Sequence, residues 1–121
     1  MRCFKVLTIS AAACLLFAGS AHAGGVLYTG GAYTGPGTTT VCRVTNVGKK
    51  PVEVTVEPMD STGIAESTNT ETYPVGYSGG YPGTDDTRYC RFTLVKGSKK
   101  SVRGTMHVSN ATGMLFVLEA R

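Results

Sequence analysis

The sequence is poor in the residues from which catalytic sites and membrane-spanning segments are built. Its 121 residues include no tryptophan and only two histidines, and charged residues make up 17% of the chain. The longest apolar stretch, residues 6–18, falls short of the about 20 residues that a membrane-spanning helix needs. With no evident acid–base pair, the sequence predicts a single small domain that is not an enzyme and that uses no cofactor or metal.

The beginning of the chain has the three-part pattern of an export signal. Arg2 and Lys5 give a positive start, the apolar stretch follows, and small residues occupy both ends of Ala21-His22-Ala23. We therefore expect a signal peptide over residues 1–23, cleaved between Ala23 and Gly24, and a secreted or periplasmic protein. Lipid attachment at Cys14 is the less favoured alternative, because the residues before it are all alanine.

Charge is nearly balanced once the expected signal is removed. Residues 24–121 contain ten basic and eight acidic residues, a net charge of +2. So small an excess predicts neither a nucleic-acid partner nor an anionic membrane partner, and the mature chain contains no apolar run that could span a membrane.

Cysteine is also scarce, because only Cys42 and Cys90 remain in the mature chain. Two thiols in an oxidising compartment are predicted to form one disulfide. Two buried free thiols and a redox pair are the alternatives, and the absence of C-x-x-C spacing disfavours the redox pair.

Where apolar residues are present, they alternate with polar ones, which is the period of a half-buried strand. Glycine, asparagine and aspartate lie between the alternating segments, as hairpin turns require. The pattern predicts an all-β fold, a single antiparallel β-sandwich over residues 40–121, with a closed barrel as the alternative. The expected strands cover residues 40–45, 52–57, 90–94, 102–108 and 114–120.

Two glycine-rich segments do not follow this alternation. Residues 24–39 are expected to form either a loose N-terminal arm or a short edge strand. Residues 74–87 are expected to form a long exposed loop. Tyr73, Tyr77 and Tyr81 make this region the candidate binding loop, because tyrosine rings among glycines can present flat surfaces to a sugar or a protein.

The run from Val41 to Gly48, followed by Pro51 and alternating valines up to Val56, is similar to immunoglobulin-like domains of bacterial exported proteins. The mature chain as a whole resembles short bacterial secreted proteins of unassigned function that end in a strand closing with Ala-Arg. This resemblance implies an immunoglobulin-like β-sandwich in which Cys42 and Cys90 bridge the two sheets. The chain departs from true immunoglobulin domains in lacking the core tryptophan and in having Arg88 at the corner-tyrosine position.

Three motifs could carry chemistry, and each has a simpler interpretation. Ser78 lies in a G-x-S-x-G match, but no helix follows it, so a glycine-rich loop explains the match better. His107 is the sole mature histidine and is expected at the surface. Asp85 and Asp86 are adjacent, so their side chains point apart in an extended chain and suit neither hydrolysis nor a well-filled calcium site.

Two lysine pairs, Lys49-Lys50 and Lys99-Lys100, lie in expected turns. Lysine there either protects sheet edges or forms a patch for an anion or a polysaccharide. Taken together, the sequence predicts an exported, non-enzymatic protein with a binding or structural role at the cell envelope or outside the cell. Its partner would be a protein or a polysaccharide, and the alternative roles are an inhibitor of a secreted hydrolase and a subunit of a surface polymer.

Overall fold

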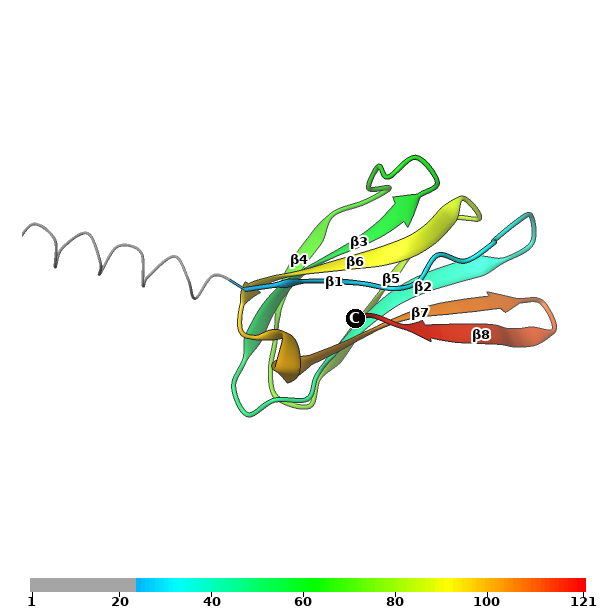
Figure 1. Ribbon diagram of the computed structural model, residues 1–121. Coiled ribbons are helices and arrows are strands. Elements are labelled where there is room, and N and C mark those ends of the chain that lie inside the picture. Colours follow the sequence, from blue (N-terminus) through cyan, green and yellow to red (C-terminus); the bar gives the residue numbers. More distant parts are fainter. Residues whose placement is uncertain (1–23) are drawn as a thin grey trace, which may run out of the picture.

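The longest strands form where apolar and polar residues alternate most regularly. The computed structural model describes residues 24–121, so the expected signal peptide lies outside the described residues (Figure 1). Burial alternates residue by residue along most of four strands, as one core-facing side requires. These strands are β2 (Thr39–Asn46), β3 (Val52–Asp60), β6 (Thr87–Lys96) and β7 (Val102–Asn110).

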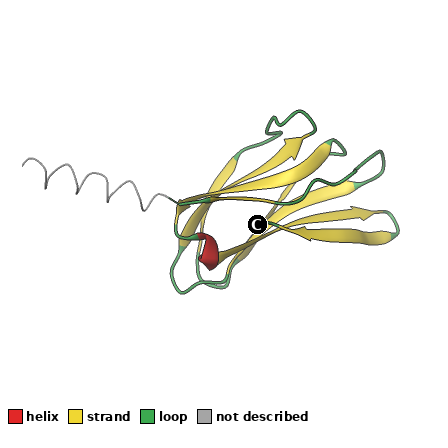
Figure 2. Cartoon of the chain, viewed as in Figure 1, coloured by secondary structure: helices red, strands yellow, loops and turns green. Residues whose placement is uncertain are grey.

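Four further strands complete two antiparallel sheets of four strands each. They are β1 (Val26–Tyr28), β4 (Asn69–Tyr73), β5 (Ser78–Pro82) and β8 (Gly113–Glu119). The strand orders are β1-β6-β3-β4 and β5-β2-β7-β8, here called sheet I and sheet II. A single short 3-10 turn, Lys99–Ser101, is the helical part of the described chain (Figure 2). The expectation of an all-β fold built from two packed antiparallel sheets is confirmed.

The core lies between the two sheets and is built mainly from valine. Val44, Val54 and Val56 are fully buried, and Phe92 and Met106 are among the largest fully buried side chains of the same core. Within this core Cys42 of β2 and Cys90 of β6 form a disulfide, with their Cα atoms 5.7 Å apart. The predicted disulfide is thus confirmed, and it ties sheet II to sheet I.

The two glycine-rich segments are more ordered than their composition suggests. Residues 26–28 form the edge strand β1, the second of the two alternatives, and Leu27 is buried in the core. The expected long loop over residues 74–87 instead contains β5, which pairs with β2. Glycine lets β5 lie close to the other sheet, because a Cβ atom at Gly79 would lie only 2.6 Å from the ring of Tyr73 on β4. No helix within residues 24–121 is long and apolar enough to cross a membrane.

Candidate functional site

The three tyrosines of the candidate binding loop do not share one exposed loop. Tyr73 ends β4 and is only 4% exposed, and its hydroxyl donates a hydrogen bond to the hydroxyl of half-buried Tyr81 at 3.0 Å. Burial raises the pKa of both phenols above the usual value. Tyr77 lies in the turn before β5 and is 64% exposed. Two of the three rings therefore close the side of the sandwich, and only Tyr77 could meet a ligand.

Ser78 and His107 lie too far apart to act as a nucleophile and its base. The Ser78 hydroxyl donates to the carbonyl of Val44 at 3.1 Å, whereas His107 shares a hydrogen bond of 2.9 Å with Thr105. On β2, Ser78 pairs with Thr45 and His107 pairs with Val41. These partners are four positions apart, so Ser78 and His107 are separated by about 13 Å along the strand direction alone. Burial, followed by the charge of Arg43, lowers the pKa of the His107 imidazole.

Asp85 and Asp86 are both exposed in the turn that precedes β6. Within residues 24–121, no three histidine, cysteine or acidic side chains gather in a way that could hold a metal ion.

A cluster that sequence reasoning did not identify lies on the outer face of sheet I. The register of the sheet places Tyr28 of β1 beside Arg91 of β6, and Arg91 beside Glu57 of β3. Tyr89 lies two residues before Arg91 on the same strand face, and its ring centroid is 6.3 Å from that of Tyr28 at an interplanar angle of 48°. We call these four residues the tyrosine face.

An ion pair fixes the polar centre of the tyrosine face. The Nη2 and Nε atoms of Arg91 lie 2.9 and 3.0 Å from Oε1 of Glu57. The second carboxylate oxygen, Oε2, accepts a hydrogen bond of 3.0 Å from the Thr68 hydroxyl. The hydrogen bond with Glu57 raises the pKa of the Arg91 guanidinium above its usual value. Both charged groups are therefore held in one orientation before any ligand arrives.

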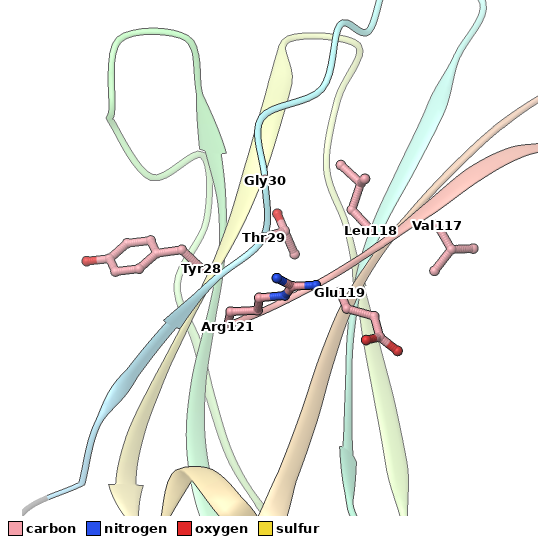
Figure 3. Close-up of a pocket in the computed structure, with 7 residues that line it drawn as sticks. All are labelled: Tyr28, Thr29, Gly30, Val117, Leu118, Glu119 and Arg121. Atoms are coloured by element: carbon pink, nitrogen blue, oxygen red, sulfur yellow. The ribbon is translucent and has the colours of Figure 1, made fainter.

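One tyrosine ring remains exposed beside this fixed pair, and the other, Tyr89, is half-buried. Tyr28 is 47% exposed, and its ring points away from the opening between β1 and the end of β8 (Figure 3). Next to the tyrosine face, Thr93, Thr55 and Thr70 form a cross-strand row, in which the last two hydroxyls are 2.8 Å apart. This surface offers aromatic rings, two fixed charges and several hydroxyl groups, and it has few aliphatic side chains.

Alternation along β3 and β6 predicts that Glu57 and Arg91 point outward. It does not predict that they are neighbours, because residues 34 positions apart are brought together only by the register of the sheet. The alternative of an edge strand over residues 24–39 was the one signal that could have led to Tyr28.

A second exposed surface lies on β8, the last strand of sheet II. Met114, Leu115 and Val117 are 59%, 49% and 46% exposed, and residues 113–118 contain no charged side chain.

Comparison with known proteins places the chain by its fold alone. No protein-family model matches it, and no curated protein matches it significantly. The chain is similar in structure to Thermotoga maritima 1070. That crystal structure superposes with a TM-score of 0.54 over 79% of this chain and 91% of the other chain, at 6% sequence identity. A likeness at this identity shows a shared fold and carries no functional assignment.

Proposed function

We propose that this chain is an exported, non-enzymatic β-sandwich that binds a polysaccharide on the outer face of sheet I. The observation that carries the proposal is the tyrosine face, in which the exposed ring of Tyr28 and the half-buried ring of Tyr89 lie beside an ion pair with fixed geometry. The export-type N-terminal sequence and the disulfide support a role outside the cytoplasm.

The chemistry of the tyrosine face matches that of a sugar chain. A sugar ring has C–H groups that can lie against a tyrosine ring, and its hydroxyls can both donate and accept hydrogen bonds. The Arg91 guanidinium, whose side chain is 33% exposed, can donate charge-assisted hydrogen bonds to such hydroxyls, while Glu57 holds it in place. Because these groups are ordered in advance, little side-chain freedom is lost on binding.

The sandwich that presents this face is proposed to be immunoglobulin-like in its central strands. β2, β3 and β6 take the places of strands B, C and F, and the disulfide joins the B and F positions. The edges differ, because β1 pairs with β6 where strand G would lie and β7 pairs with β2 where strand A would lie. This exchange brings Tyr28 to the side of Arg91.

Isothermal titration calorimetry with soluble polysaccharides tests the proposal directly. Purified residues 24–121 would be titrated with dextran, arabinoxylan and polygalacturonate, and at least one is expected to bind. The double variant Tyr28→Ala/Tyr89→Ala should weaken that binding about thirtyfold, if each ring contributes about 1 kcal/mol.

Two other variants complete the test. Tyr77→Ala removes an exposed ring elsewhere and should leave the affinity unchanged. Glu57→Gln keeps the shape of the side chain but removes its charge, and it should weaken binding. Absence of binding to every polymer, or equal losses in the Tyr77 variant and the double variant, would refute the proposal.

A second candidate function is self-assembly into a surface polymer, and the apolar surface of β8 favours it. Two copies could pack their uncharged 113–118 segments together without repulsion between like charges. Sedimentation velocity at increasing concentration would show this association, and Val117→Glu should abolish it. A monomer at all concentrations would refute this candidate.

A further inference from the structure

Five lysines gather at one end of the sandwich. Lys49 and Lys50 lie in the turn between β2 and β3, and Lys96 ends β6. Lys99 and Lys100 lie in the 3-10 turn that leads into β7. This is also the end at which the described chain begins (Figure 1).

A cavity of about 530 Å³ opens among these lysines. Lys49, Lys50 and Lys96 line it, together with the hydroxyls of Ser98 and Ser101, which are 3.2 Å apart. No acidic residue lines the cavity. It therefore offers three ammonium groups and two hydroxyl donors, and no group in its wall would repel an anion.

Positive charge exceeds negative charge at this end of the sandwich, where Glu53 is the cross-strand neighbour of Lys96 but forms no salt bridge with it. Among residues 24–121 the one salt bridge joins Arg91 to Glu57. Glu53 is the acidic residue in register with Lys96, whereas Asp60 ends β3 and Asp85 precedes β6, so these two lie at the opposite end of the sheets from the lysines. Apart from the five lysines, the described chain has five arginines and eight acidic residues, so its remainder has a net charge of −3. The net charge of the mature chain conceals this asymmetry.

The lysine-lined cavity and the tyrosine face are parts of one surface. β6 carries Tyr89 and Arg91 in its first half and ends at Lys96. The five steps along the strand from Arg91 to Lys96 span about 17 Å. A chain of a few sugar units can reach over this distance, so a single polymer could occupy both places.

We infer that the polysaccharide bound by the tyrosine face is acidic, and that its anionic groups are held in the lysine-lined cavity. This inference rests on the proposed function. Lysine amines bind anions as exposed point charges. The tyrosine face binds the sugar rings, and the cavity selects polymers that carry charge. A flat anionic vesicle could contact the end of the sandwich but not the outer face of sheet I at the same time.

Two forms of one polymer separate charge from sugar recognition. Residues 24–121 would be titrated with polygalacturonate and with fully methyl-esterified polygalacturonate, which differ in their carboxylate charge. The acidic form is expected to bind about tenfold more tightly at low salt, with each of three lysines contributing modestly. This preference should decrease when the salt concentration is raised from about 20 to about 200 mM, because salt screens exposed charges.

Matched variants locate the effect in the cavity. Lys49→Gln/Lys50→Gln/Lys96→Gln should remove the preference for the acidic form and leave binding of the ester unchanged. The control variant Arg43→Gln/Arg88→Gln/Arg121→Gln removes three positive charges outside the lysine end and should keep the preference. Thermal unfolding would confirm that both variants are folded, and the single variant Lys96→Gln should show a part of the effect.

The possible failures can be told apart. If both polymers bind equally and the lysine variant changes nothing, this inference is wrong and the proposed function stands. If neither polymer binds, this inference is overturned, and the wider polysaccharide panel decides the proposed function. Lysine-dependent binding to phosphatidylglycerol vesicles without binding to polygalacturonate would also overturn it, in favour of a membrane ligand.

Discussion

Reducing the Cys42–Cys90 disulfide should lower the free energy of unfolding by about 4 kcal/mol. The two cysteines are separated by 48 positions in the chain. The chain-entropy estimate for a closed loop of this length gives about 4 kcal/mol at 25 °C. A domain of this size has a total stability of about 5–15 kcal/mol, so the loss would be a large part of the whole. The structure adds a reason to expect a full effect, because the disulfide links two sheets that otherwise meet mainly through side-chain packing.

Urea unfolding followed by far-UV circular dichroism measures this contribution and does not need tryptophan fluorescence, because the chain contains no tryptophan. The oxidised protein, the protein reduced with a phosphine, and the variant Cys42→Ala/Cys90→Ala would be compared. The reduced protein keeps both buried sulfur atoms, so it isolates the cross-link from the loss of packing volume. A decrease in the urea midpoint of roughly 2–4 M is expected on reduction. A decrease in unfolding free energy below about 1 kcal/mol, or free thiols in the purified protein, would refute the reasoning.

Three further predictions concern the core packing at Gly104, the buried hydrogen bonds of Asn46 and the titration of His107. Gly104→Ala should destabilise the fold by about 1–3 kcal/mol in urea unfolding, because the new methyl would lie 2.6 Å from the ring of Phe92; Gly31→Ala, with open space around it, should cost less than about 0.5 kcal/mol. Asn46→Ala should cost about 2–3 kcal/mol, since the buried amide donates to two carbonyls and its oxygen accepts a third hydrogen bond. The folded protein depresses the pKa of His107 below 6.5, so the unfolded chain binds more protons below that pH. Stability should then fall between pH 7 and pH 5, and His107→Gln should show a smaller decrease in thermal midpoint over that interval.

The sequence predicted well the strands in which alternation itself determines the structure. In β3, valines at alternate positions face the core, and the polar residues between them face outward, so a period of two was sufficient to find the strand. The two cysteines could be paired because no other cysteine competes for them in the mature chain.

Two strands could not be predicted because they have little apolar alternation of their own. β4 consists of Asn-Thr-Glu-Thr-Tyr, and only Tyr73 is buried. β5 consists of Ser-Gly-Gly-Tyr-Pro. Each is an edge strand whose conformation depends on backbone pairing with a central strand. For the same reason, Tyr73 and Tyr81 could be expected in a loop, although in the structure they are close together across two sheets.

The tyrosine face could not be predicted from the sequence either, because it depends on which strands are neighbours in the sheet. Tyr28 and Tyr89 are 61 positions apart, and only the pairing of β1 with β6 brings them together. No pattern along a single strand contains that information.

The ion pair of the tyrosine face is difficult to explain by stability alone. The side chain of Glu57 is only 11% exposed, so its carboxylate has lost most of its water. Removing a charge from water costs several kcal/mol, and a paired partner often only balances that cost. In the next row of the same face, the cross-strand positions are occupied by the neutral side chains of Thr93, Thr55 and Thr70. The strands of sheet I therefore pair without charged residues in that row. An ordered guanidinium beside an exposed tyrosine is better explained by a hydroxyl-rich ligand, since Arg91 can then donate directed hydrogen bonds without first being ordered.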